Sequence, residues 1–316
     1  MTTAWVAALE RSCPGRVMVD EPLAPYTTYR IGGPADALLE PESAEDVQRA
    51  FAVVRGYDVP WVALGLGSNV LVEDAGFRGL VVRIGRALSA IREHDGGWEV
   101  GAGLPTPLLA RRSAQRGLAG VHRLVGVPGT VGGGVSMNAG AHGQEFRHVV
   151  RSVTLVRADG TVEHRPGAAI AWRYRSSGLT GVVVLAADLA LTPGNPDRLS
   201  AEITEHLRWR KAGTPFSEAC CGSVFRNPTD TIVLSPDAAG GEPRELRTAG
   251  QLIEAAGLTG FRIGDAEVSP IHGNYIVNVG GASAADVRRV MDAVRDRVAQ
   301  RFGIALDLEV QLIGAA

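Results

Sequence analysis

Two long glycine-rich segments constrain this chain more than any other feature of its sequence. LGLGSNVLVEDAGFRG spans residues 64–79 and VGVPGTVGGGVSMNAGAHG spans residues 125–143. Glycine has no Cβ, so it lets backbone N–H groups approach an anion closely and it accepts positive φ. We therefore expect the two segments to cradle the phosphates of a ligand. Tight turns alone would explain one such loop, but two long ones in the same half of the chain favour a phosphate site.

Neither segment is one of the best-known phosphate-binding loops. Residues 65–70 and 101–106 both lack the third glycine of a Rossmann fingerprint. Lys211 is the only lysine of the chain, which excludes a Walker A loop because that loop needs a lysine after its second glycine.

The bulk properties predict a cytoplasmic protein of two or three domains, because 316 residues are too many for one compact core. A formal net charge of −2 shows no basic excess for nucleic acid. The N-terminal sequence does not read as a signal peptide, and no run reaches the roughly 18 apolar residues that span a bilayer. Three cysteines form no spaced framework, which favours a reducing compartment.

Local patterns predict most of the helices and strands. Residues 1–22 read as a short helix and a linker, and residues 125–143 look too rich in glycine for an ordinary helix or strand. Capping pairs predict helices from Ser43 and Ser283, and Asp-Gly turns predict hairpins at residues 95–96 and 159–160. Further predictions are helices over residues 108–116 and 199–213, strands at 37–40, 61–64, 80–84 and 182–191, an alternating final strand at 306–312, and an exposed loop at 235–245.

This mixture of hairpins and helices, with few βαβ units, predicts an α+β fold. The Pro- and Gly-rich stretch at residues 193–196 predicts the main domain boundary. We expect an N-terminal helix and linker over residues 1–21, a cofactor domain of two α+β lobes over residues 22–193, and a substrate domain over residues 197–316.

The two glycine-rich segments look like the pyrophosphate-binding segments of the UDP-N-acetylenolpyruvoylglucosamine reductases. That family has the FAD-binding fold of vanillyl-alcohol oxidase, also called the PCMH-type fold. Further motifs resemble those of the family in the same order, and together they cover about residues 22–314. They are TTYRIGGPAD (27–36), WRYRSS (172–177), CCGSVFRNP (220–228), AGQLIEAAGLTG (249–260), IHGNYIVN (271–278) and LDLEVQLIG (306–314).

The chain resembles the shorter class of the family, because its C-terminal half has no evident insertion. It also departs from the family at several positions. The departing residues are Leu66 for Gly, Gly134 for Ala, Thr214 for Gln, Cys220 and Cys221 for Ser and Ala, and Ile271 for Lys.

The resemblance implies an FAD-dependent oxidoreductase that reduces the enolpyruvyl ether of UDP-N-acetylglucosamine to UDP-N-acetylmuramate, with NADPH as the hydride donor. The product feeds bacterial peptidoglycan synthesis, and with it cell-wall biogenesis, cell shape and cell division. We expect FAD to be bound without a covalent link, because His142 is the only His or Cys in the two cofactor segments.

The resemblance also implies three catalytic residues, and each has a plainer alternative. Arg175 matches an arginine that would grip the enolpyruvyl carboxylate, but it could form a structural salt bridge. Ser223 matches a proton donor, but it could cap its own turn. Glu309 matches a catalytic acidic residue, but it could face solvent like Asp307 and Gln311, its neighbours in the alternating pattern.

The remaining candidate residues would bind the cofactor or the substrate. The cofactor set is Gly65, Gly67, Ser68, Asn69, Gly129, Thr130, Gly132, Gly133, Asn138 and Gly140. The substrate set is Tyr174, Arg210, Lys211 and Asn227, with Arg208 in the same basic cluster. A solvated helix end would explain the basic cluster equally well, and Tyr174 could belong to the core.

Two other function classes remain open from sequence. One is a different oxidoreductase of the same FAD fold, such as an oxidase of a sugar or lactone. The other is a non-catalytic protein that binds flavin or a nucleotide sugar. We expect no metal site, because the sequence has no HExxH and no Cys-x-x-Cys pattern. We expect a small-molecule substrate, no nucleic-acid or membrane partner, and a monomer.

Overall fold

The computed structural model of the chain describes residues 3–234 and 244–314. The chain divides into two compact units, and three separate stretches build each of them. The first unit contains residues 1–22, 34–66 and 77–210, and the second contains residues 23–33, 67–76 and 211–316. Two short stretches from the N-terminal part of the sequence therefore belong to the unit that holds the C-terminal part.

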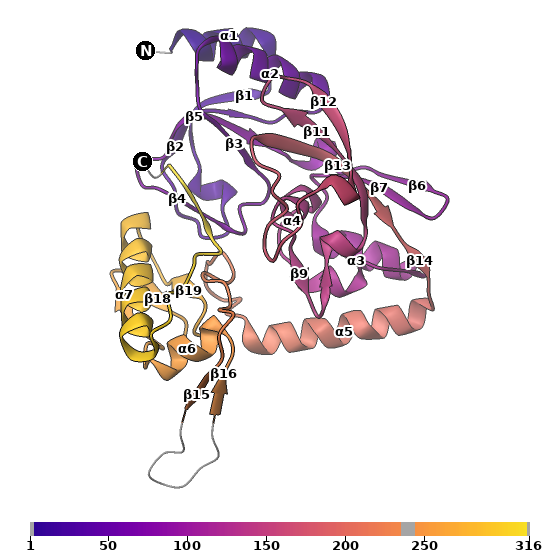
Figure 1. The fold of residues 1–316 in the computed structure, drawn as a ribbon. Helices are drawn as coiled ribbons and strands as arrows, with labels where there is room; N and C mark the ends of the chain where they lie inside the picture. The colour runs from indigo at the N-terminus through magenta and orange to yellow at the C-terminus, as the bar shows by residue number, and fades with distance from the viewer. Residues whose placement is uncertain (1–2, 235–243, 315–316) are drawn as a thin grey trace. The chain divides into compact units, whose positions relative to one another are not determined.

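The apolar runs predicted as strands at residues 37–40, 61–64 and 80–84 form three of the four strands of the first sheet in the first unit. This sheet has four strands in the order β1–β2–β5–β3 (Figure 1). β1 (Val17–Pro22) runs antiparallel to β2 (Pro34–Leu39). β5 (Phe77–Arg83) runs parallel to both β2 and β3 (Trp61–Leu64). The sheet mixes parallel and antiparallel pairs, as an α+β fold allows.

Two helices share one apolar core with this sheet. α1 (Ala4–Ser12) and α2 (Ala44–Gly56) contact each other and bury residues among those of β2 and β5. The predicted start of α2 is confirmed, because Ser43 Oγ accepts a hydrogen bond from the backbone N–H of Asp46.

The linker predicted at the end of residues 1–22 is wrong. Val17–Pro22 forms strand β1, in which Val17 pairs with Leu39 and Val19 with Ala37. The run is short and none of its residues is buried, so it shows no strong pattern of its own. Its pairing partner, which the sequence alone does not name, makes it a strand.

The second sheet of the first unit has five antiparallel strands in the order β12–β11–β13–β7–β6. The Asp-Gly turns join β6 to β7 and β11 to β12, so both predicted hairpins are confirmed. The two sheets correspond to the two lobes expected for the cofactor domain. The strands are β6 (Ile91–His94), β7 (Gly97–Gly101), β11 (Val150–Arg157), β12 (Val162–Pro166) and β13 (Val182–Ala190).

The second glycine-rich segment contains a helix, contrary to the expectation from its composition. α4 (Val131–Ser136) starts at Thr130, whose Oγ1 accepts a hydrogen bond from Gly133 N. A Cβ at Gly134 would collide with Cε2 of the buried Phe146. Tertiary packing therefore outweighs the low helix propensity of glycine here, because an alanine at residue 134 would meet the Phe146 ring.

Further helices and short strands complete the first unit. α5 (Pro196–Gly213) buries Leu199 and Ile203 in one cluster with residues of α3 (Thr106–Gln115). The other short strands pair as β8 (Leu118–Ala119) with β14 (Thr192–Pro193), and β9 (Gly140–Ala141) with β10 (Gln144–Glu145). Single 3₁₀ turns of this unit lie at Arg86–Leu88, His122–Gly126, Phe146–His148 and Gly167–Ala169.

The second unit contains a pairing that the sequence did not predict. β4 (Val70–Val72), inside the first glycine-rich segment, runs parallel to β20 (Gln311–Ile313) at the end of the chain. The predicted final strand is thus shorter than its alternating pattern. The other elements of this unit are a 3₁₀ turn (Ala24–Tyr26), β15 (Ile232–Leu234), β16 (Arg244–Leu246), α6 (Ala249–Ala255), β17 (Arg262–Ile263), β18 (Ala266–Val268), β19 (Ile276–Asn278) and α7 (Ala284–Phe302).

The last long helix follows its sequence signals closely. Ser283 and Asp286 form the predicted capping box of α7, and Gly303 ends the helix in the left-handed conformation.

The exposed loop predicted at residues 235–245 lies mostly outside the described residues. The domain boundary predicted at residues 193–196 stays a prediction; α5 begins there. No helix within residues 3–234 and 244–314 is both long enough and apolar enough to cross a membrane.

We predict that Gly134→Ala destabilises the protein through its contact with Phe146. Overpacking of a filled core typically costs about 1–3 kcal/mol, which exceeds the gain in helix propensity of about 1 kcal/mol. Phe146→Leu should remove part of the collision, so the double variant should be more stable than the sum of the two single changes. Urea unfolding of all three variants with saturating FAD measures this coupling.

The matched control is Gly133→Ala in the same helix. A Cβ at Gly133 meets only Thr130 Oγ1 at 3.7 Å, which is an ordinary contact. We expect it to leave the free energy of unfolding nearly unchanged or to raise it slightly. Equal losses at residues 133 and 134 would show that the glycines are needed for another reason.

Candidate functional site

Arg175 lies in a tight turn of the first unit. Arg173 N donates to Ser176 O at 2.8 Å, and Ser176 N donates to Arg173 O at 3.2 Å. Tyr174 and Arg175 are the two residues between these bonds. Arg175 has a φ of +54°, a left-handed conformation that costs an L-residue on the order of 1 kcal/mol or more. Strain of this kind is common at functional sites, so the turn is consistent with a required position for the Arg175 side chain.

This turn is fixed to the second glycine-rich segment. Asn138 Nδ2 donates to Arg173 O at 2.9 Å, and Ser177 Oγ donates to Ser136 O at 2.6 Å. The structure therefore brings Arg175 next to the segment expected to bind the cofactor, although 35 residues separate Arg175 from Gly140 along the chain.

The Arg175 side chain contacts a backbone carbonyl and an aromatic ring. Its Nη2 donates to Gly140 O at 3.4 Å, and its guanidinium carbon lies 4.8 Å from the centre of the Tyr174 ring. Tyr174 is 45% exposed, so it does not belong to the core. A guanidinium that stacks on an exposed ring is held in one orientation and can still present N–H groups to an anion.

Asn138 is buried, and its side chain is fully used inside the protein. Its Nδ2 donates to Glu145 Oε2 at 3.0 Å as well as to Arg173 O, and its Oδ1 accepts from Arg147 N at 3.0 Å. The side chain therefore shapes the second segment. The backbone N–H of Asn138 is used inside the protein as well, because it donates to Val135 O at 3.1 Å.

The first segment meets the second at Gly65, within the first unit. A Cβ at Gly65 would lie 2.6 Å from Thr130 Oγ1, so only glycine fits at this approach. Gly67 has a φ of +61°, and a Cβ there would collide with Tyr26 O in the second unit. A Cβ at Gly65 would thus meet the side chain of Thr130, and a Cβ at Gly67 would meet backbone atoms.

The two segments differ in the backbone N–H groups that they leave for an anion. Within the described residues, the N–H groups of Gly65, Gly67 and Ser68 donate no hydrogen bond. In contrast, the N–H groups of Val131 and Gly132 at the start of α4 donate to carbonyl groups of the fold. The first segment therefore leaves backbone N–H groups that an anion could accept, whereas the N–H groups at the start of α4 are already bonded.

Ser223 and Glu309 are neighbours in the second unit. Glu309 N donates to Val224 O at 2.8 Å, and Phe225 and Leu308 face each other in an antiparallel bridge. The segment that follows Ser223 therefore pairs with the segment that carries Glu309. This pairing joins two motifs that lie about 80 residues apart in the sequence.

The environment of Ser223 does not support the alternative that it caps its own turn. Ser223 is half-buried. Its hydroxyl makes no hydrogen bond with any residue that the structure describes. A turn-capping serine would bond to a nearby backbone group, so the Ser223 hydroxyl has no such structural role and can serve a ligand.

Glu309 does not share the solvent-facing position of Asp307 and Gln311. Those two residues are exposed, whereas Glu309 is half-buried. Burial raises the pKa of the Cys221 thiol above its usual range, and the charge of Glu309 adds to this effect. The Glu309 carboxylate is therefore less exposed than its alternating neighbours, and it lies near the buried Cys221.

The predicted substrate residues are spread over several elements. Asn227 Oδ1 accepts from Ala249 N at 3.1 Å at the start of α6, which gives it a structural role. Arg210 and Lys211 lie at the C-terminal end of α5, where the first unit ends and the second resumes. Their contacts with a substrate, and those of Tyr174, stay predictions.

Sequence reasoning missed the residues that hold the candidate catalytic groups in place. Ser136 and Ser177 fix the Arg175 turn. Tyr29 is fully buried, and its hydroxyl donates to Ile276 O at 2.8 Å in the core beside Cys221. Ser177 and Tyr29 lie inside the quoted motifs WRYRSS and TTYRIGGPAD, so their place in those motifs was the available signal.

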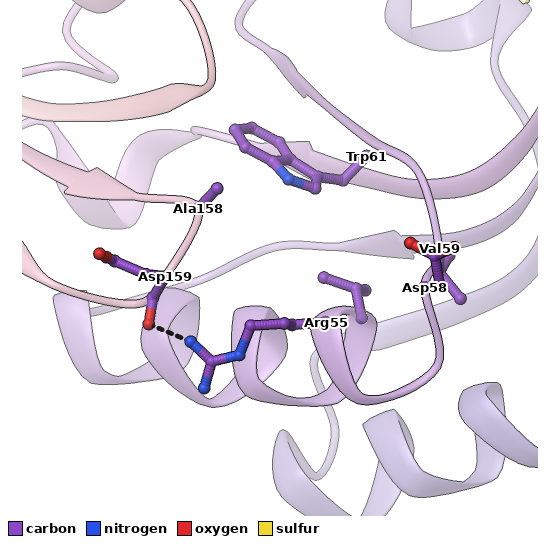
Figure 2. Close-up of a pocket in the computed structure, with 7 residues that line it drawn as sticks. Arg55, Asp58, Val59, Trp61, Ala158 and Asp159 are labelled. Carbon is purple, nitrogen blue, oxygen red and sulfur yellow. Dashed lines mark hydrogen bonds between the residues drawn. The ribbon is translucent and has the colours of Figure 1, made fainter.

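A pocket of about 280 Å³ lies in the first unit, and none of its residues belongs to the predicted site. Figure 2 shows that the guanidinium of Arg55 donates a hydrogen bond to the backbone O of Asp159, with Trp61 on the opposite side. The Asp159 carboxylate accepts hydrogen bonds from Thr161, so the polar groups of the pocket largely satisfy one another. Within the described residues, no group of three or more His, Cys, Asp or Glu side chains could hold a metal ion.

Two family models match the chain. A model of an FAD binding domain matches residues 35–165, which include both glycine-rich segments. A model of the C-terminal domain of UDP-N-acetylenolpyruvoylglucosamine reductase matches residues 214–313, which include Ser223 and Glu309. The fold and these matches define an FAD-dependent flavoprotein of the oxidoreductase class.

Relatives and a solved structure agree with these matches over nearly the whole chain. The chain is 38% identical to UDP-N-acetylenolpyruvoylglucosamine reductase 1 of Bacillus cereus over 303 residues, 95% of each protein. It is 42% identical to the reductase of Rubrobacter xylanophilus over 298 residues, 93% of this chain and 94% of that protein. The crystal structure of UDP-N-acetylenolpyruvylglucosamine reductase from Thermus caldophilus superposes with a TM-score of 0.76 at 33% identity, covering 94% of this chain and 98% of that one. The chain belongs to the UDP-N-acetylenolpyruvoylglucosamine reductase family.

We predict that the three free cysteines differ strongly in reactivity. Burial raises the pKa of Cys13 and of Cys221, so both thiols stay protonated near neutral pH and are poor nucleophiles. Cys220 is half-buried and should react first. Alkylation by iodoacetamide at pH 8, followed by peptide mass spectrometry, should show fast labelling of Cys220 alone.

The same labelling in urea should modify all three cysteines and is the positive control. Cys220→Ser should abolish the fast phase in the folded protein. Fast labelling of Cys221 in the folded protein would contradict the burial of this thiol beside Glu309.

Proposed function

We propose that this chain reduces the enolpyruvyl ether of UDP-N-acetylglucosamine to the lactyl ether of UDP-N-acetylmuramate, using FAD and NADPH. Its membership of the family and the match to both domains support this reaction. The observation that carries the proposal is that each candidate catalytic group is joined to a glycine-rich segment. Arg175 donates a hydrogen bond to Gly140 O of the second segment. The backbone O of Glu309, which lies on the segment paired with that of Ser223, accepts a hydrogen bond from Asn69 of the first segment.

The reaction requires two things of the protein besides the cofactor. When bound, FAD supplies the hydride that the vinyl carbon accepts, after NADPH has supplied it to the flavin. Negative charge then moves toward the carboxylate and the α carbon of the substrate. The protein must hold a fixed positive group at the carboxylate and a proton donor at the α carbon.

Arg175 would bind the carboxylate. Its guanidinium is permanently charged, and two of its N–H groups match the two oxygens of a carboxylate. The Tyr174 ring and Gly140 O fix the guanidinium on one side. This arrangement stabilises the charge that develops during the reaction and orients the enolpyruvyl group.

Ser223 would donate the proton to the α carbon. A serine hydroxyl is a very weak acid, so it donates only when charge builds directly beside it. Because the hydroxyl has no hydrogen bond to the described residues, it can turn toward a substrate. Glu309, on the paired segment, is an ionisable neighbour that can return a proton to this serine.

The remaining roles follow from the same proposal. Lys211, Arg210 and Asn227 would contact the UDP diphosphate, and Tyr174 would line the substrate site. We propose that the enzyme acts as a monomer in the cytoplasm. Its product would enter peptidoglycan synthesis and so affect cell shape and division.

The test separates the two half-reactions in Ser223→Ala. Flavin reduction by NADPH does not need the proton donor, so its rate should stay near that of the parent. Reoxidation of the reduced enzyme by the enolpyruvyl substrate should fall at least 100-fold, which is the usual lower contribution of a positioned general acid. Anaerobic stopped-flow absorbance measures both rates, and Ser223→Cys should restore part of the second.

Ser217→Ala is the matched control. Ser217 lies in the same unit, is exposed, and donates to Glu218 at 2.6 Å. Neither half-reaction should change in this variant. If Ser223→Ala slows flavin reduction as much as reoxidation, the hydroxyl shapes the flavin site instead of donating the proton.

A further inference from the structure

Asn69 of the first glycine-rich segment makes two hydrogen bonds to the segment that carries Glu309. Its side-chain Nδ2 donates to Glu309 O at 3.0 Å, and its backbone O accepts from Gln311 N at 3.0 Å. All these residues belong to the second unit. Asn69 therefore contacts the final segment on both sides of Val310.

These contacts extend the parallel pairing of β4 and β20 beyond its last backbone bond. The pairing begins at Val70 and Gln311. Glu309 O lies two residues before Gln311, outside the paired residues of β20. The side-chain amide of Asn69 donates to it, as a backbone N–H group of a ladder would.

The other side of the Glu309 peptide is bonded to the segment of Ser223. Glu309 N donates to Val224 O at 2.8 Å, while Glu309 O accepts from Asn69. The backbone of Glu309 is thus held between the proton-donor segment on one side and the cofactor segment on the other. These two anchors hold the backbone from which the Glu309 side chain extends.

We propose that Asn69 is a positioning residue for Glu309, in addition to any contact of its loop with FAD. This inference rests on the proposed function. Through one amide, the segment that holds the cofactor also sets the place of the acidic residue beside Ser223. Loss of the amide donor should make the backbone at Glu309 more mobile and shift the carboxylate relative to Ser223. No titratable group is changed by this substitution.

The inference predicts a selective defect. Misplacement of a catalytic group by about 1 Å can cost on the order of 100-fold in rate. Hydride transfer from NADPH to the flavin does not use Glu309, whereas reaction of the reduced enzyme with the enolpyruvyl substrate does. Asn69 should therefore affect the second half-reaction far more than the first.

The experiment compares Asn69→Leu, which keeps the size but removes the donor, with Asn69→Ser, which keeps a shorter donor. Both are reconstituted with FAD, and anaerobic rates are expressed per bound flavin. For Asn69→Leu we expect flavin reduction by NADPH within about threefold of the parent and reoxidation slower by about tenfold or more. Asn69→Ser should lie between Asn69→Leu and the parent, and the pH profile of reoxidation should change in Asn69→Leu.

Asn278→Leu is the matched control in the same unit. Asn278 Nδ2 also donates to a backbone carbonyl, Tyr29 O at 3.2 Å, and within the described residues Asn278 makes no hydrogen bond to the segment that carries Glu309. Its replacement should leave the ratio of the two rates unchanged, whatever it does to stability.

Three outcomes would overturn the inference. Equal slowing of both half-reactions in Asn69→Leu would make Asn69 a residue of the flavin site alone, and unchanged rates would make its bond to Glu309 dispensable. A parent enzyme whose reduced flavin the enolpyruvyl substrate does not reoxidise would overturn the proposed function, and this inference with it. The parent measurement distinguishes that failure from the other two.

Discussion

The close backbone approach of the two glycine-rich segments is the constraint on which the candidate site depends. At Gly65 the first segment passes so near Thr130 of the second that a Cβ would lie 2.6 Å from its hydroxyl oxygen. Side chains at such positions would push the segments apart. Because Gly65 has none, the two segments lie close together, as the proposed pyrophosphate site requires.

The candidate catalytic groups are attached to these segments through backbone and amide hydrogen bonds. The Arg175 turn is joined by hydrogen bonds to Asn138 and Ser136, and the segment that carries Glu309 accepts a hydrogen bond from Asn69. Such bonds fix the main chain that carries a reactive side chain without using the reactive atoms themselves. In both cases a change in the cofactor segment would be transmitted to a catalytic side chain.

The sequence predicted the features that depend on neighbouring residues. The cap of α2 at Ser43, the capping box of α7 and the two Asp-Gly hairpins are local, and all are confirmed. Strand β1 and the pairing of β4 with β20 were missed, because each depends on a distant partner. The helix α4 was missed because its glycines are required by contacts such as that with Phe146, which outweigh helix propensity. For the site, the family motifs supplied the candidate residues, but they could not show that Asn69 holds Glu309 or that the hydroxyl of Ser223 is not used in its turn.

The central claim is that this chain passes a hydride from NADPH through FAD to an enolpyruvyl ether. The most direct test is the anaerobic absorption spectrum of the purified protein during successive additions. The account predicts the bands of oxidised flavin, their bleaching by NADPH, and their return when the enolpyruvyl ether of UDP-N-acetylglucosamine is added in the absence of oxygen. Flavin bands that return only when air is admitted would contradict the account and favour an oxidase, and a protein without flavin bands after reconstitution with FAD would contradict it altogether.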